Sequence, residues 1–116
     1  MRQTASILLT TALLALVAGC SGDPNKTDAE LGLNAQQAQG RRVFKARCAI
    51  CHTAYSSSSS KGPALRGLYQ KEYLPSGLVA NDRFVIESIV RGRRMMPATT
   101  MTRQELDDLI AYLHTL

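Results

Sequence analysis

Two cysteines and a histidine stand together in the run Cys48-Ala49-Ile50-Cys51-His52, which has the spacing C-x-x-C-H. This spacing is typical of covalent c-type haem attachment. The two thiols can add to the two vinyl groups on one edge of a porphyrin, and the histidine that follows can turn its imidazole onto the iron. Cys48 and Cys51 are therefore candidate thioether residues, and His52 is a candidate iron ligand.

Two other uses of a C-x-x-C pair are less well supported by the surrounding sequence. A thioredoxin-like dithiol lies in a βαβ unit, whereas the residues around Cys48 have a helical pattern. A structural zinc ion needs two further ligands at metal-binding spacing, and only His114 is left to supply one. The pattern favours haem over both alternatives.

The remaining cysteine, Cys20, ends an apolar N-terminal segment. Residues 5–18 form a mainly apolar stretch of 14 residues, which is too short to span a bilayer, since that needs about 20, and which matches the hydrophobic region of an export signal. Val17-Ala18-Gly19-Cys20 resembles the lipobox of bacterial lipoproteins, which implies cleavage before Cys20 and lipidation of this residue. We predict a signal peptide over residues 1–19 and a lipidated, flexible tether over residues 20–33. The folded domain would then span residues 34–116.

Helices are expected to position the C-x-x-C-H motif, and no alternating strand pattern persists. Helix caps and apolar periodicity predict helices from Asn34 to about Arg47, from about Asn81 or Asp82 to Gly92, from Thr102 onward, and, as a short one, within residues 64–71. Gly40 falls inside the first helix, where glycine costs about 1 kcal/mol relative to alanine. We therefore expect another backbone to pack closely against it, in an all-α fold.

With these elements in place, residues 34–116 resemble a small class I monohaem cytochrome c. The matching positions are Gly40 and Phe44, the C-x-x-C-H motif, Gly62-Pro63 and Leu65, Gly92, Met96-Pro97 and Tyr112. The resemblance implies three to four helices around one covalently bound haem c, and it implies that the Pro63 carbonyl accepts a hydrogen bond from His52. The family's tryptophan near a haem propionate is absent here, and either Tyr69 or Tyr73 could replace it.

The second iron ligand has four candidates after the motif: Met95, Met96, Met101 and His114. His114 and Met101 are tied to the two ends of the predicted C-terminal helix, whereas Met95 and Met96 lie in a loop. Pro97 restricts the backbone of the residue before it and so sets Met96 apart from Met95. The Met-Pro pair of the family leads to the same choice, and we expect His52 and Met96 to be the axial ligands.

Composition narrows the class of protein. A chain of 116 residues is too short for several domains, and 45 % hydrophobic residues are too many for a disordered one. Only 5 % of residues are aromatic, so a haem would supply much of the bulk of the core. The net charge is +5, and many basic residues lie around the motif and the Met-Pro pair, namely Arg41, Arg42, Lys45, Arg47, Lys61, Arg66, Lys71, Arg91, Arg93 and Arg94. They form either a plain solvated surface or a positive ring that steers an acidic redox partner.

These features together predict a one-electron carrier and not an enzyme. The expected protein is attached by a lipid on Cys20 to the periplasmic side of a bacterial membrane, and Ser21 favours the outer membrane. An alternative is a dedicated cytochrome subunit of a periplasmic dehydrogenase or reductase. A haem enzyme or gas sensor is less well supported, because two axial ligands leave the iron no open position. Nucleic acid is not expected as a partner, since no binding motif is present.

Overall fold

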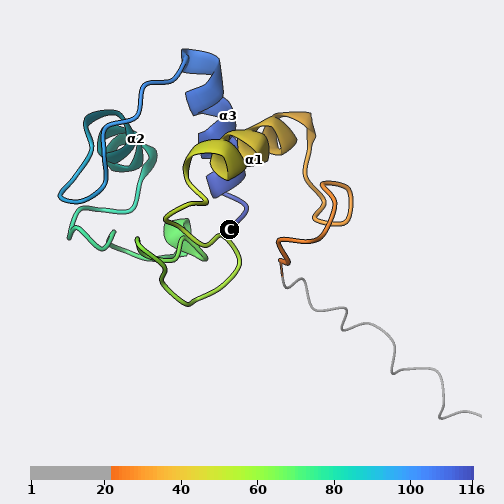
Figure 1. The fold of residues 1–116 in the computed structure, drawn as a ribbon, viewed down its shortest axis with the longest axis horizontal. Coiled ribbons are helices and arrows are strands. Elements are labelled where there is room, and N and C mark those ends of the chain that lie inside the picture. Colours follow the sequence, from red (N-terminus) through yellow and green to blue (C-terminus); the bar gives the residue numbers. More distant parts are fainter. Residues whose placement is uncertain (1–21) are drawn as a thin grey trace, which may run out of the picture.

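The computed structural model describes residues 22–116, and Cys20 and the predicted signal peptide lie outside them. The described chain is helical, with α1 (Ala35–Arg47), the short 3₁₀ helix η1 (Leu68–Gln70), α2 (Asp82–Arg91) and α3 (Arg103–Leu113) (Figure 1). Between residues 22 and 116 the only β-type pairs are two isolated bridges, Tyr73–Val79 and Arg93–Met96. The predicted all-α class is confirmed, in agreement with a class I cytochrome c fold. In the same residues no helix is both long and apolar enough to cross a bilayer.

Helix α1 begins at a capping box. The Asn34 Oδ1 accepts a hydrogen bond from the backbone N–H of Gln37 at 2.8 Å, and the Gln37 Oε1 accepts one from the N–H of Asn34 at 2.9 Å. These bonds satisfy two backbone donors that the helix itself leaves unpaired. Thr102 and Glu105 form a second capping box, at the start of α3.

Helix α2 is bounded by one polar residue and one glycine. The Asn81 side chain accepts a hydrogen bond from the N–H of Phe84 at 3.0 Å, which caps the N-terminus of the helix. The helix ends at Gly92, whose φ of 72° is one that side chains with a Cβ rarely adopt. The three predicted helices therefore have the expected bounds, and η1 lies inside the region expected to hold a short helix.

Helices α1 and α3 cross in direct contact. A Cβ added at Gly40 would collide with the backbone carbonyl of Asp108 and would lie 2.7 Å from the Tyr112 Cβ. One turn further along α1, the Phe44 ring packs on the Tyr112 ring with centroids 5.6 Å apart. The close backbone approach predicted for Gly40 is present.

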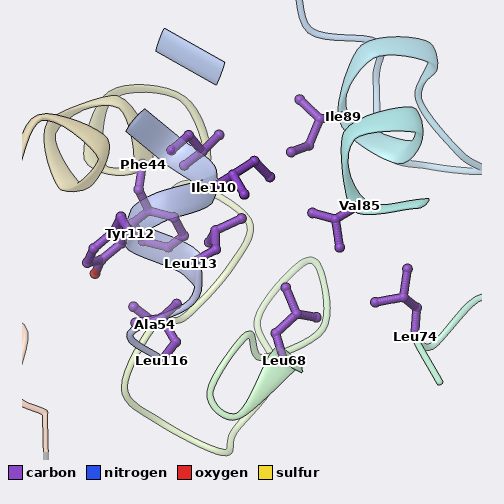
Figure 2. Packing of buried hydrophobic residues seen from close by; sticks show 11 residues of the cluster. Phe44, Ala54, Leu68, Leu74, Val85, Ile89, Ile110, Tyr112, Leu113 and Leu116 are labelled. Carbon is purple, nitrogen blue, oxygen red and sulfur yellow. The ribbon is translucent and has the colours of Figure 1, made fainter. Parts of the chain in front are cut away.

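The hydrophobic core joins α1 and α3 to η1 and α2. In Figure 2, α2 contributes Val85 and Ile89 from one side, and α3 contributes Ile110 and Leu113 from the other. The remaining buried members of the cluster are Phe44, Ala54, Leu68, Leu74, Leu109, Tyr112 and Leu116. Aliphatic side chains therefore supply most of this core.

The N-terminal segment, residues 22–33, departs from the flexible tether that the sequence suggested. The Arg41 side chain is only 4 % exposed, and its guanidinium donates to the Asp28 carboxylate at 2.8 Å. It also donates to the backbone carbonyls of Pro24 at 3.0 Å and Lys26 at 2.8 Å. These bonds hold the segment in a series of turns against α1, so the ordered structure begins well before residue 34.

Candidate functional site

The C-x-x-C-H motif forms a compact turn at the C-terminal end of α1. Cys48 caps the helix, and its N–H donates to the Phe44 carbonyl at 2.8 Å. The N–H groups of Cys51 and His52 both donate to the Cys48 carbonyl, at 3.0 and 2.9 Å. Helix α1 thereby fixes the backbone positions from which the two thiols and the imidazole project. Both cysteines are free thiols.

The environment of Cys48 argues against a redox-active dithiol. Its side chain is half-buried, and this burial raises the pKa of the thiol, with a smaller contribution from Cys51 and an opposing one from Arg47. Reactive dithiols of the thioredoxin type depend on a lowered thiol pKa. Among the described residues, moreover, no three His, Cys, Asp or Glu side chains converge as ligands for one metal ion.

The imidazole of His52 is fixed by Gly62 and Pro63. The His52 Nδ1 lies 2.7 Å from the Pro63 carbonyl oxygen, which is the contact that the resemblance implies for these two residues. Since a carbonyl can only accept, Nδ1 must carry the proton, and the lone pair is then on Nε2. A Cβ added at Gly62 would lie 2.7 Å from the His52 Cε1, so the glycine lets the backbone lie against the ring.

The loop after α2 is a tight turn. The Arg93 N–H donates to the Met96 carbonyl at 2.9 Å, and the Met96 N–H donates to the Arg93 carbonyl at 3.0 Å. Arg94 has a φ of 54° within this turn, in the left-handed region that residues other than glycine seldom occupy. A Cβ added at Gly92 would lie 2.7 Å from the Met96 carbonyl oxygen, so Gly92 is needed for the turn to close. The backbone of Met96 is thereby fixed on both sides.

This turn separates the methionine candidates. Met95 is 93 % exposed and points away from the core, whereas Met96 is partly buried and packs against the hydrophobic cluster. Met101 is also partly buried there, directly before the Thr102 cap. The structure thus excludes Met95 from the core and leaves Met96 and Met101 facing it.

The fourth candidate, His114, is engaged elsewhere. Its Nε2 lies 2.8 Å from the Asp82 Oδ1, and its ring stacks on the Tyr69 ring with centroids 3.8 Å apart. These contacts join the end of α3 to the start of α2. Tyr69 is half-buried by the stack, whereas Tyr73 is 53 % exposed, so Tyr69 is the more enclosed of the two tyrosines considered for a haem propionate.

The residues present fit a haem. The His52 imidazole has its Nε2 free of the Pro63 contact, and the partly buried Met96 carries a thioether. Imidazole and thioether are both ligands that haem iron takes. The Nε of Arg93 and the hydroxyl of Ser76 are buried without a hydrogen-bond partner in the described chain. Buried polar atoms normally have partners, and propionate carboxylates could accept from both groups.

Two members of the expected positive ring are not free on the surface. Arg41 is buried against the N-terminal segment, and Arg47 donates to the Thr100 carbonyl at 2.9 Å and to the Glu105 carboxylate at 3.2 Å. Both arginines therefore hold segments together and cannot be counted as docking charges. Sequence reasoning also missed the hydrogen bond from the Tyr112 hydroxyl to the Tyr55 hydroxyl, 2.8 Å long, because nothing local signals it.

The chain is similar to known c-type cytochromes over most of its length. Residues 35–113 match the family described as cytochrome c oxidase, cbb3-type, subunit III. A cytochrome c of Theileria annulata is 34 % identical, over 66 % of this chain and 82 % of its own length. A cytochrome c-553-like protein of Synechocystis sp. is 32 % identical, over 74 % of each chain. The cytochrome c oxidase subunit 2 of Alkalihalophilus pseudofirmus is 29 % identical, over 67 % of this chain but 25 % of its own length.

Proposed function

Because this chain belongs to the small monohaem c-type cytochromes and is a haem-based electron carrier, we propose that it passes single electrons at the periplasmic side of a bacterial membrane. In this proposal a lipid on Cys20 holds it at that membrane. The observation that carries the redox part is the His52 imidazole, held by Pro63 directly after two free thiols at the end of α1.

Each residue of the site has a defined part in this proposal. Cys48 and Cys51 would hold the haem covalently, and His52 and Met96 would bind its iron. The haem supplies a one-electron couple between ferric and ferrous iron when bound. The Pro63 carbonyl keeps the Nδ1 of His52 protonated and its ring oriented, which raises the basicity of Nε2. Methionine as the second ligand raises the reduction potential relative to two histidines.

The same ligand set gives the reason for proposing a carrier and not an enzyme. With both His52 and Met96 bound to the iron, no position would be left for a substrate or a gas. Anaerobic titration should therefore take up one electron per chain, and carbon monoxide should leave the spectrum of the reduced protein unchanged at neutral pH. A carbon monoxide complex formed by the unaltered protein would contradict the proposal and favour a sensor or enzyme.

The anchor is proposed from the apolar segment that ends at Cys20. Replacement of Cys20 by alanine should release the haem protein into the soluble fraction or leave its signal uncleaved, because no thiol remains to accept a lipid. The neighbouring change Ser21→Ala is the control and should leave the protein in the membrane fraction. A Cys20→Ala protein that stays membrane-bound and is correctly processed would contradict the anchor.

A second candidate function is that of a fixed cytochrome subunit of a larger redox enzyme. It is favoured by the description of the matched family as an oxidase subunit and by the oxidase subunit among the similar proteins. Purification in mild detergent distinguishes the two, because a fixed subunit comes through with its enzyme in constant ratio. A free carrier instead elutes alone. It reduces its partner in a bimolecular reaction, and the rate of this reaction should fall as ionic strength rises if the partner's surface is acidic.

A further inference from the structure

The described chain lies against the folded domain from its first residue, Gly22. A Cβ added at Gly22 would collide with the Tyr55 ring, so the backbone already lies on the domain at this residue. Only Ser21 stands between Gly22 and Cys20. Two residues of fully extended chain span at most about 7 Å, so whatever is attached to Cys20 stays close to this side of the domain.

That side of the domain carries an open basic hollow. The hollow has a volume of about 550 Å³ and lies between residues 24–28 and one face of α1. Its cationic lining residues are Lys26, Arg41, Arg42 and Lys45. Arg41 is buried in the contact with the N-terminal segment, whereas Arg42 and Lys45 are exposed. The hollow thus offers positive charge to the solvent.

The carboxylates beside the hollow are already occupied. The hydrogen bond from Arg41, followed by the charges of Arg41, Arg42 and Lys45, holds the pKa of Asp28 below its ordinary value. Glu30 accepts hydrogen bonds of 2.7 Å from both the N–H and the hydroxyl of Thr27. Asp28 is the one carboxylate among the residues that line the hollow, and it stands against four cationic side chains, so the hollow keeps a net positive charge.

We propose that this hollow is the membrane-facing surface of the domain, and that Arg42 and Lys45 contact the phosphate groups of anionic phospholipids. The inference deepens the proposed function, because the lipid on Cys20 would bring this surface to the bilayer. Basic residues close to a bilayer are attracted by anionic lipid headgroups. Arg41 keeps residues 24–28 in place, and Gly22 lies against Tyr55, so the anchor would also set the orientation of the domain.

This orientation leaves the redox side open. In Figure 1 the N-terminal segment and α2 lie on opposite sides of α1 and α3. The Met96 turn directly follows α2 in the chain. A domain that rests on the basic hollow therefore turns α2 away from the bilayer, where a soluble partner can reach it.

Lysine labelling tests the orientation on the full lipidated, haem-loaded protein. The protein is placed in vesicles of phosphatidylglycerol and phosphatidylethanolamine and treated with an amine-reactive reagent. Labelling of Lys45 should fall at least tenfold relative to the same protein in detergent, whereas labelling of Lys71, which is also exposed, should not change. If the vesicles change the labelling of both lysines equally, or protect Lys71 alone, the proposal is overturned.

A second measurement does not depend on lipidation. Haem-loaded mature chain carrying Cys20→Ser, exported behind an ordinary signal, is sedimented with the same vesicles and with phosphatidylcholine vesicles. Binding should require the anionic lipid. The double change Arg42→Gln with Lys45→Gln should weaken binding about thirtyfold, because each basic residue near the membrane surface contributes a similar attraction and the two losses multiply. The matched pair Arg66→Gln with Lys71→Gln should change it less than threefold.

A failure of the lipid anchor can be told apart from a failure of the membrane-facing surface. An intact mass without acyl groups would contradict the anchor, and the sedimentation result would still decide the surface. If the Arg42 and Lys45 changes leave vesicle binding intact but slow electron transfer to an acidic protein, the hollow is a protein-docking surface and the lipid proposal is overturned.

Discussion

His52 is held by two backbone features that act on different parts of its ring. The Pro63 carbonyl accepts from Nδ1 at 2.7 Å, and the Gly62 backbone lies against the ring at Cε1. The first contact fixes the tautomer, and the second leaves no room for a side chain. Both residues of the Gly62-Pro63 pair are therefore needed, Gly62 to leave room for the ring and Pro63 to accept its hydrogen bond.

Replacement of Gly62 by alanine should displace the imidazole. The new Cβ would lie 2.7 Å from the His52 Cε1, closer than real contacts allow, so either the ring or the loop must move. We expect a loss of about 1–3 kcal/mol in the free energy of unfolding, the usual cost of overpacking, together with a partly high-spin ferric spectrum. Denaturant titration and absorbance measure the two effects. The exposed neighbour gives the control Lys61→Ala, which should change neither, and a Gly62→Ala protein with unaltered stability and spectrum would contradict this role.

At the scale of elements, the fold depends on one close crossing and one buried arginine. Helices α1 and α3 touch at Gly40, where only hydrogen fits between the two backbones. Arg41, the next residue, points to the other neighbour of α1 and holds the N-terminal segment. Consecutive residues of one helix thereby fix two different contacts.

The change Gly40→Ala separates helix propensity from packing. Alanine should favour an isolated helix by about 1 kcal/mol over glycine. Here its Cβ would collide with the Asp108 carbonyl, so we expect a net loss of about 1–3 kcal/mol in the free energy of unfolding. The exposed Gln39→Ala on the same helix is the control and should be neutral or slightly stabilising. Thermal or denaturant unfolding measures the change in stability. A Gly40→Ala protein more stable than the original would contradict the close contact of α1 and α3 at Gly40.

The N-terminal segment should come off α1 in acid. The hydrogen bond from Arg41 is the main cause of the lowered pKa of Asp28 in the folded protein. A carboxyl group with a lowered folded pKa stabilises the docked segment above its unfolded pKa of about 4, and this contribution is lost as pH falls through the folded value below that.

Nuclear magnetic resonance of the reduced protein can follow this release through the amides of residues 24–28. We expect their shifts to move to those of a released segment below about pH 4, as Asp28 takes up a proton. Asp28→Asn should weaken docking at every pH and remove the acid step. Asp107→Asn, at an exposed pair with Arg103, is the control. An acid step unchanged in Asp28→Asn would mean that another group holds the segment.

At the scale of the whole molecule, two pairs of basic residues lie on different parts of the chain's surface. Arg42 and Lys45 line the hollow beside the N-terminal segment. Arg93 and Arg94 lie in the turn that carries Met96 and directly follows α2. In Figure 1, α2 and the N-terminal segment lie on opposite sides of α1 and α3. We propose the first pair as the contact with a membrane and the second as part of the contact with a redox partner.

Local signals in the sequence were enough to predict the helices. The capping boxes at Asn34 and Thr102 and the glycine at Gly92 are short-range patterns, and the structure has each of them. The C-x-x-C-H motif is equally local, and the haem c that it predicts agrees with the family of the chain.

The long-range contacts could not be predicted in the same way. Arginine is a residue type that usually lies on the surface. The partner of Arg41, Asp28, is 13 residues earlier, in a segment rich in turn formers. Burial of an arginine depends on a partner and several carbonyls that only the folded chain brings together. For this reason the sequence suggested a free tether where the structure has a docked segment.

The central proposal is that His52 and Met96 both bind the haem iron. A sulfur ligand to ferric haem gives a weak near-infrared band, which can be recorded for the original protein and for Met95→Ala, Met96→Ala and Met101→Ala. The account predicts that Met96→Ala alone loses the band, becomes high-spin or water-ligated, and binds carbon monoxide when reduced. Loss of the band in Met101→Ala with the band retained in Met96→Ala would contradict the claim.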